Sequence, residues 1–300
     1  RRAIITNSVV NSMVNRGGIT FAFRTQEEAG ATPEQVARAF VVCREVFGLP
    51  DYVAAVEALD AVVSTKVQTA LYLEFRRLMD RAVRWFLGAR PSQLDIGAEI
   101  ERFGALVREL SPSVPGMLRG EEKRRLDRRV AEFEKDGVPH DLAVRAAALL
   151  DSYSLLDIIE ITKESGREPA SVATLYYLVS ERFGIDTMLS KVTRLPREDR
   201  WDALARGALR DDLYGVLESL TRSVIEASKG DGAGDGESES ENESSPAQDF
   251  ERWASANADS IARSTTALTA IRRLDNPNIA ALSVALRALR SVIRAGASGA

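Results

Sequence analysis

Apolar residues recur every three or four positions along most of this 300-residue chain, a spacing that predicts amphipathic helices rather than strands. Thr32-Pro33-Glu34-Gln35 supplies an N-cap, a proline in the first helical position and a capping-box glutamine. Gly and Pro residues separate the other apolar runs. These signals predict helices at about 33–47, after Pro50, and at 65–87, 94–110, 119–136, 139–150, 152–164, 169–183, 186–194, 197–227, 249–274 and 277–294.

Strand signals are nearly absent from the chain. The only candidate is the segment from Ile19 to Phe23, and no period of 20 to 50 residues recurs. The composition is 45% hydrophobic but only 6% aromatic, which also favours helices. We therefore expect an all-α protein, an irregular multi-helix bundle without sequence repeats.

One segment lacks any apolar side chain larger than Ala. Residues 229–248 contain six acidic residues and one Lys, a net charge of −5, with Gly and Ser between them. Such a segment cannot bury enough surface to offset its ordering entropy, so we expect a disordered acidic linker. The predicted organisation is then a helix and turn over 1–31, a main helical domain over 32–228, the linker, and a C-terminal helical hairpin over 249–300 that packs back on the main domain.

The first predicted helix carries no charged residue from position 3 to position 15. Helical spacing places Asn7, Asn11 and Asn15 on one side and a cluster of Val and Met on the other. Asn is a mediocre helix former, so a second polar surface packed on this side would explain the pattern. The alternative is an exposed, uncharged polar face. The sequence begins at Arg1 without Met, and we expect it to be part of a longer polypeptide.

Residue counts exclude several classes of site. One Cys and one His cannot form a disulfide framework or a Cys/His zinc site. Cys43 lies in an apolar helical run, so we expect a buried, inert thiol and a reducing, cytoplasmic setting. No run reaches the eighteen apolar residues that a membrane span requires, and no signal peptide is recognisable, so no membrane partner is expected.

The charge pattern argues against nucleic-acid binding. The whole chain carries −4, so the part outside the acidic segment is nearly neutral at +1, and its Arg residues alternate with Glu and Asp. The most basic run, residues 123–129, is interpreted as a solvated helix face. His140 starts a helix, where we expect it to be exposed and without a catalytic role.

Catalytic and nucleotide-binding motifs are missing. The glycines at 230, 232, 234 and 236 are spaced by two throughout, and neither a strand nor a helix frames them as a dinucleotide fingerprint requires. GxxxxGK[ST] and GxSxG are absent. We assign no catalytic, cofactor-binding or metal residue, and a small helical enzyme with a site assembled from distant residues is disfavoured.

Asp212 is the one unusual carboxylate in the pattern. It falls in the middle of the apolar side of the helix predicted over 197–227. A buried carboxylate needs a partner, so Asp212 is a candidate buried structural charge held by an Arg from another helix or by backbone NH groups. The alternative, equally weighted, is that the apolar stripe drifts and Asp212 reaches water.

Several blocks of the sequence resemble the C-terminal helical region of the large bacterial NAD-specific glutamate dehydrogenases. The matching opening blocks are Ile4-Ile5, Asn11, Met13-Val14-Asn15-Arg16, Gly18-Ile19-Thr20-Phe21 and Glu27-Glu28-Ala29-Gly30-Ala31. The later ones are Ala37-Arg38-Ala39-Phe40, Arg44-Glu45-Val46-Phe47, Arg84-Trp85, Leu155-Leu156-Asp157-Ile158, Asp199-Arg200-Trp201, Leu204-Ala205-Arg206, Ala208-Leu209-Arg210-Asp211-Asp212-Leu213-Tyr214 and Leu282-Ser283-Val284-Ala285-Leu286-Arg287. Asn7 has no match, and the acidic segment is longer than the family pattern.

The resemblance implies a parent enzyme that deaminates glutamate to 2-oxoglutarate and ammonia with NAD as hydride acceptor. The family's catalytic domain, with its nucleotide-binding sheet, would lie upstream of Arg1, so this fragment should bind neither substrate nor NAD and be inactive alone. Its expected role is to brace or regulate that domain, or to contact other subunits of a homo-oligomer. Asn11, Asn15 and Arg16 become the candidate interdomain contact. The alternative is an independent all-α protein-interaction module.

Overall fold

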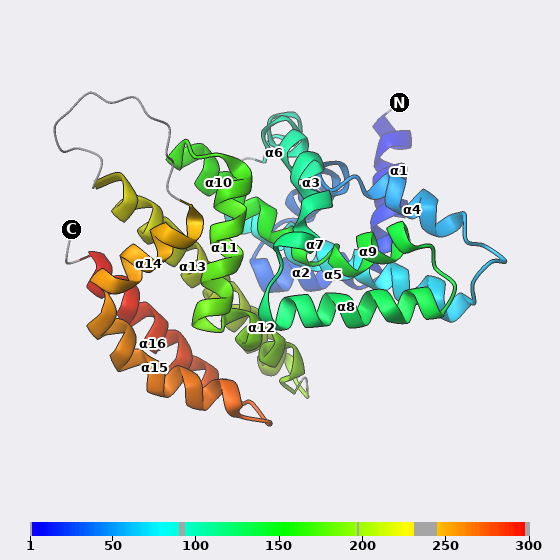
Figure 1. Cartoon of the computed structure of the whole chain (residues 1–300). Helices are drawn as coiled ribbons and strands as arrows, with labels where there is room; N and C mark the ends of the chain where they lie inside the picture. Colours follow the sequence, from blue (N-terminus) through cyan, green and yellow to red (C-terminus); the bar gives the residue numbers. More distant parts are fainter. Residues whose placement is uncertain (1, 90–93, 197, 231–244, 298–300) are drawn as a thin grey trace. The chain divides into compact units, whose positions relative to one another are not determined.

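The computed structural model describes residues 2–89, 94–196, 198–230 and 245–297, with side chains omitted for residues 2–8, 230 and 295–297. The described residues form α-helices and two short 3₁₀ turns and contain no strand, which confirms the expected all-α fold (Figure 1). Residues 231–244, the centre of the predicted linker, lie outside this description. The helices on either side reach into the predicted linker, to Gly230 on one side and from Pro246 on the other.

The chain divides into two compact units. Unit 1 comprises Arg1–Gly116 and Arg124–Leu156, and unit 2 comprises Met117–Lys123 and Asp157–Ala300. The main domain expected over 32–228 is therefore shared between the two units. The elements of unit 1 are α1 (Arg2–Gly17), α2 (Phe21–Ala29), α3 (Pro33–Val46), α4 (Leu49–Glu57), α5 (Thr65–Ala89), α6 (Ile96–Leu110), η1 (Ser111–Ser113), α7 (Val114–Met117), most of α8 (Gly120–Lys135), α9 (His140–Ala148) and η2 (Asp151–Ser154).

Unit 1 is built around α3 and α5, which pack against each other. The capping box at Thr32 forms as predicted: the Thr32 hydroxyl accepts from the Gln35 amide, and the Gln35 side chain accepts from the Thr32 amide. Tyr52 is fully buried and donates from its hydroxyl to the Leu71 carbonyl at 2.8 Å, which satisfies its polar end. Caps and buried apolar faces therefore fix these helices where the sequence predicted them.

Two local expectations in unit 1 were wrong. The candidate strand at Ile19 to Phe23 runs instead into α2, which ends at Gly30 in the left-handed conformation with φ 62°. Ile19 and Phe23 are both exposed, so the apolar pattern there does not mark a buried strand face. The long helix was predicted over 65–87, but α5 continues through Gly88 to Ala89.

The helices of unit 2 pack around α13. They are α10 (Leu155–Ser165), α11 (Pro169–Phe183), α12 (Ile185–Arg194), α13 (Arg200–Gly230), α14 (Pro246–Ala256), α15 (Ala258–Arg273) and α16 (Ile279–Ala297). α16 lies along both α13 and α15, and the last two helices of the chain run side by side in Figure 1. α14 packs on α11 and α13, where Phe183, Phe250 and Trp253 form an aromatic cluster.

The single helix expected over 249–274 is two helices. Asn257 separates α14 from α15, and its side-chain amide donates to the Trp253 carbonyl at 2.9 Å. That hydrogen bond satisfies a carbonyl at the end of α14 and competes with continuation of the helix. At the start of α13, Asp199 accepts from the Asp202 amide at 2.9 Å, so the helix begins at Arg200 rather than at 197.

The N-terminus of α8 is closed by a residue from α12. Asp186 accepts from the Glu121 amide at 2.7 Å and stands where a local cap would otherwise be needed. Gly120 adopts φ 53°, and a Cβ at this position would collide with the Asp186 carboxylate. Burial raises the pKa of Asp186, while the amide hydrogen bonds from Glu121 and Thr187 oppose that rise.

Candidate functional site

The asparagine side of α1 is open to solvent where its side chains are described. Asn11 and Asn15 are both exposed. The side chain of Asn7 lies outside the described side chains. That these asparagines face another polar surface therefore stays a prediction.

The apolar side of α1 is only partly covered. Met13 is buried, whereas Val10 and Val14 are exposed. Ile19 and Phe23, which follow in the turn and in α2, are exposed as well. The N-terminal end of unit 1 thus presents both amide and apolar side chains to solvent.

Arg16 already has partners inside unit 1. Its Nη2 lies 2.8 Å from Glu57 Oε1, and its guanidinium carbon lies 5.5 Å from the centre of the Tyr72 ring. Glu57 ends α4 and Tyr72 belongs to α5, so Arg16 fastens the end of α1 to both helices. Among the three candidate contact residues, Arg16 therefore has a structural role that the sequence did not indicate.

Asp212 is not buried. Its side chain is 45% exposed, and Oδ1 lies 2.6 Å from Arg290 Nη2 of α16. This corrects the expectation of a buried charge: the partner is an Arg from another helix, but the carboxylate reaches water. An exposed ion pair contributes little to stability, so Asp212 is not the charge that holds unit 2 together.

One fully buried carboxylate of unit 2, Asp249, was missed by sequence reasoning. Its side chain is 0% exposed and lies 2.6 Å from Arg167 Nη1, and Arg167 also donates to Ser228. The sequence contained a signal for the helix that carries Asp249. Ser245-Pro246-Ala247-Gln248 forms a complete capping box, which starts this helix inside the predicted linker. Asp249 follows that box directly and turns toward the core.

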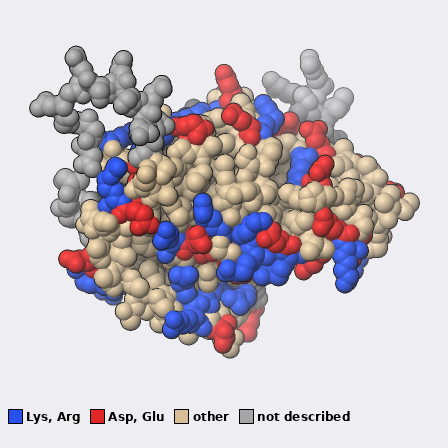
Figure 2. Space-filling model, viewed as in Figure 1, with Lys and Arg blue, Asp and Glu red and all other residues tan. Residues whose placement is uncertain are grey.

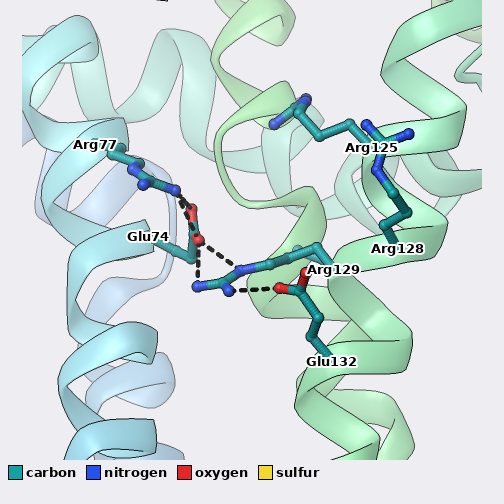
Figure 3. A pocket seen from close by; sticks show the side chains of 7 residues that line it. Glu74, Arg77, Arg125, Arg128, Arg129 and Glu132 are labelled. Carbon is teal, nitrogen blue, oxygen red and sulfur yellow. Dashed lines mark hydrogen bonds and ion pairs between the residues drawn. The ribbon is translucent and has the colours of Figure 1, made fainter.

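Glu74 of α5 is a buried carboxylate of unit 1, and two arginines pair with it. Its side chain is 4% exposed. Arg77 Nη1 lies 2.9 and 3.0 Å from the two Glu74 oxygens, and Arg129 Nε of α8 lies 3.0 Å from Oε1 (Figure 3). Arg129 also pairs with Glu132 at 2.9 Å. Two guanidinium groups therefore share one buried carboxylate.

The basic run of α8 departs from the predicted solvated face. Arg125 pairs with the buried Asp151, and Arg129 turns to Glu74, while Arg124 and Arg128 are exposed. Burial raises the pKa of Asp151, and the Arg125 and Arg81 charges oppose the rise. Two of the five basic residues in this run, Arg125 and Arg129, therefore contact η2 and α5, which a helical wheel of α8 alone cannot reveal.

A pocket of about 130 Å³ opens between these helices. In Figure 2, Lys and Arg side chains gather around α8, with carboxylates among them. The residues that line the pocket come from α5, α8 and α9: Glu74, Arg77, Arg125, Arg128, Arg129, Glu132 and Ala147. We call this set the arginine pocket.

The burial of Cys43 and the exposure of His140 were both predicted correctly from the sequence. Cys43 is fully buried, and burial raises the pKa of its thiol far above the ordinary value, which keeps it inert. His140 is exposed at the start of α9, with Nδ1 2.6 Å from Glu134 Oε1. That hydrogen bond raises the pKa of His140.

The described residues define a class: an all-α domain rich in arginine–carboxylate contacts. They contain no βαβ unit, and no group of three or more His, Cys, Asp or Glu among them could hold a metal ion. The arginine pocket is far smaller than the roughly 300–1,000 Å³ of a cleft for drug-sized ligands, so it does not fit a dinucleotide. No described helix is long and apolar enough to pass through a membrane.

Comparison with known families assigns this helical domain. Residues 1–291 match the family described as "Glutamate dehydrogenase, C-terminal". The match covers nearly the whole chain, and it agrees with the resemblance found in the sequence. The chain belongs to this family.

Individual relatives support the assignment. An NAD-specific glutamate dehydrogenase of Mycobacterium tuberculosis (strain H37Rv) is 39% identical over 299 residues, which is 100% of this chain but 18% of the relative. Proteins of the same name from Pseudomonas aeruginosa and Halomonas elongata are 36% and 34% identical over 230 residues, which is 77% of this chain and 14% of each relative. The chain therefore spans less than a fifth of the length of these relatives.

Proposed function

We propose that this chain is the non-catalytic C-terminal part of an NAD-dependent glutamate dehydrogenase that converts L-glutamate, NAD and water to 2-oxoglutarate, ammonia and NADH. The observation that carries the proposal is the family match over residues 1–291, combined with the 18% share of the Mycobacterium tuberculosis relative. The all-α fold of the described residues is consistent with it, because hydride transfer to NAD needs a nucleotide-binding domain and these residues form no βαβ unit.

The role of this chain in that enzyme is to brace or regulate the catalytic domain. A helical domain packed beside a moving domain can change turnover by favouring its open or closed form. The contact residues are Asn11 and Asn15, whose uncharged amides can donate and accept hydrogen bonds without the desolvation cost of a charge. Arg16 holds α1 in place for this contact through Glu57 and Tyr72.

The setting of the enzyme follows from the same proposal. It is a cytoplasmic homo-oligomer that uses NAD, with the upstream catalytic domain of the same polypeptide as the first partner of this chain. Neither nucleic acid nor a membrane takes part. The near-neutral charge of the chain outside the acidic segment is consistent with this set of partners.

The contact is tested in the full-length polypeptide with the double variant Asn11→Ala, Asn15→Ala. Loss of the interdomain hydrogen bonds should cost about 1 kcal/mol of free energy per lost hydrogen bond. The full-length enzyme should therefore show a lower thermal midpoint or a lower kcat. In the 300-residue chain alone, where both side chains are exposed, the same variant should change the thermal midpoint little.

Asn276→Ala is the matched control, because Asn276 is an exposed asparagine outside α1. It should leave the full-length enzyme unchanged. Unchanged kinetics and stability in the double variant would reject the interdomain contact and return the asparagine side to a plain solvated face.

A further inference from the structure

Unit 1 concentrates its exposed apolar side chains in its first two helices. Among its described residues, two large exposed apolar side chains lie elsewhere, Val62 and Leu73, whereas four fall within the first 23 residues: Val10, Val14, Ile19 and Phe23. Ile19 is 84% exposed and Phe23 is 63% exposed. Apolar side chains scattered singly over a surface need no explanation, but grouped ones are typical of a contact surface.

The described part of α1 turns an uncharged stripe to solvent. Val10, Asn11, Val14 and Asn15 are all exposed and stand at i, i+1, i+4 and i+5, so two rows of side chains run along the helix. One row is apolar and the other carries amides. Because neither row is charged, a surface that covers the stripe removes no ion from water. The stripe therefore fits a partner surface that is itself uncharged and partly apolar.

The corner between α1 and α2 has a fixed shape. Gly18 adopts φ 92°, its amide donates to the Val14 carbonyl at 3.0 Å, and its carbonyl accepts from the Phe21 amide at 3.0 Å. Phe21 is fully buried, and a Cβ at Gly17 would collide with its ring. The stripe and the exposed apolar pair that follows it thus belong to one preformed corner, which loses little conformational freedom when it is covered.

We define the N-terminal patch as Val10, Asn11, Val14, Asn15, Ile19 and Phe23. We propose that the apolar members of this patch are a docking surface, covered by an uncharged, partly apolar surface of the part of the same polypeptide that precedes Arg1. This occupant rests on the proposed function, in which the chain is the C-terminal part of a longer enzyme. The Mycobacterium tuberculosis relative is matched over only 18% of its length, so such a polypeptide has ample surface to supply.

Covalent connection favours this occupant over a separate protein or a second copy. The patch lies between residues 10 and 23, close to the point where the preceding part would join. A tethered surface meets such a patch at an effective concentration on the order of millimolar, whereas a separate molecule acts only at its own concentration. Weak apolar contacts are therefore sufficient for the tethered partner.

Hydroxyl-radical footprinting of the full-length polypeptide and of the 300-residue chain tests the docking without any substitution. Ile19 and Phe23 should be oxidised several-fold more slowly in the full-length polypeptide, because the covered patch excludes water. Val62, which is 67% exposed in the same unit, is the internal control and should react equally in both proteins. Protection should be the same at low and at high protein concentration, because the partner is tethered.

Val10→Lys tests the uncharged character of the patch. In the 300-residue chain the new ammonium group stays in water, and Lys favours a helix more than Val does, so the thermal midpoint should not fall. In the full-length polypeptide the same charge would be covered, so the thermal midpoint should fall by several degrees. Val62→Lys is the matched control and should leave both midpoints unchanged.

Equal oxidation of Phe23 in the two proteins, or equal protection of Val62, would overturn the proposal. Protection that disappears on dilution would identify a second copy as the occupant and would overturn it as well. None of these measurements uses activity. A protected patch in a polypeptide that does not oxidise glutamate would reject the proposed function alone, whereas turnover with an unprotected patch would reject the docking alone.

Discussion

Glu74 of unit 1 and Glu218 of unit 2 occupy similar places in long helices but meet opposite surroundings. Each pairs with an Arg about one turn along its own helix. Across from Glu74, α8 brings Arg129 to 3.0 Å. Glu218 instead faces the charges of Asp157 and Glu160 from α10.

The difference shows that the neighbouring helix, rather than the local sequence, determines which charges surround a carboxylate. Burial, together with the charges of Asp157 and Glu160, raises the pKa of Glu218 to about 7, although Arg222 lies 2.7 Å away. Arg222 is itself shared with Glu164, so its charge is divided between two carboxylates. Unit 1 thus places arginines around the buried Glu74, whereas unit 2 places two further carboxylates near Glu218.

The largest effect is expected from Glu74→Gln. This change leaves Arg77 and Arg129 facing a neutral amide in a nearly buried position, and removing one partner of a buried ion pair costs about 3 kcal/mol of unfolding free energy. Urea unfolding of the 300-residue chain measures it. Glu34→Gln is the control, because the Glu34–Arg38 pair is exposed and should shift stability by less than about 0.5 kcal/mol. Equal losses of unfolding free energy in the two variants would show that the buried Glu74 ion pairs stabilise the fold no more than the exposed Glu34–Arg38 pair.

An intermediate effect is expected from Glu218→Gln, and it depends on pH. The folded-state pKa of about 7 lies above the ordinary value of 4.5, so the folded protein keeps a proton that the unfolded chain has lost within this window. Wild-type stability should therefore fall as pH rises from 4.5 to 7. The neutral variant should lack this fall and exceed the wild type at pH 8 by about 1 kcal/mol, a figure reduced for the partial exposure of the side chain.

Unfolding at pH 5 and at pH 8 measures the difference between Glu218→Gln and the wild type. Glu251→Gln serves as control: its exposed carboxylate pairs with Arg182, and it should follow the wild-type dependence. If the free energies of unfolding of Glu218→Gln and the wild type change in parallel between the two pH values, the contrast between the surroundings of Glu74 and Glu218 does not hold.

The smallest effect is expected from Asp212→Ala. Because the Asp212–Arg290 pair is half-exposed, its loss should cost no more than about 0.5 kcal/mol. Asp249→Ala, which strips the buried partner from Arg167 in the same unit, should cost about 3 kcal/mol. Thermal unfolding of the two variants side by side tests the ranking, and a loss from Asp212→Ala as large as that from Asp249→Ala would reverse it.

Most helices could be predicted because their signals are local. The capping box at Thr32 and the proline at 169 each lie within one turn of the helix that they begin. The errors arose where local signals conflict. The apolar pattern at Ile19 and Phe23 predicted a strand, but both side chains are exposed, and Asn257 divides a helix that looked continuous.

The charged clusters could not be predicted because their partners are distant in sequence. Arg129 and Glu74 are 55 residues apart, and Arg167 and Asp249 are 82 apart. A helical wheel places each residue on a side of its own helix but carries no information about the helix opposite. The apolar stripe around Asp212 therefore left burial and solvent exposure equally open, and the structure places that carboxylate at the surface, paired with Arg290 of α16.

We propose that this chain is the C-terminal part of an NAD-dependent glutamate dehydrogenase and does not carry out the reaction by itself. NADH formation from L-glutamate and NAD, followed by absorbance for the full-length polypeptide and for the 300-residue chain in parallel, tests it directly. We predict turnover by the full-length polypeptide and none by the chain alone. NADH formation by the 300-residue chain, or failure of the full-length polypeptide to oxidise glutamate, would contradict the claim.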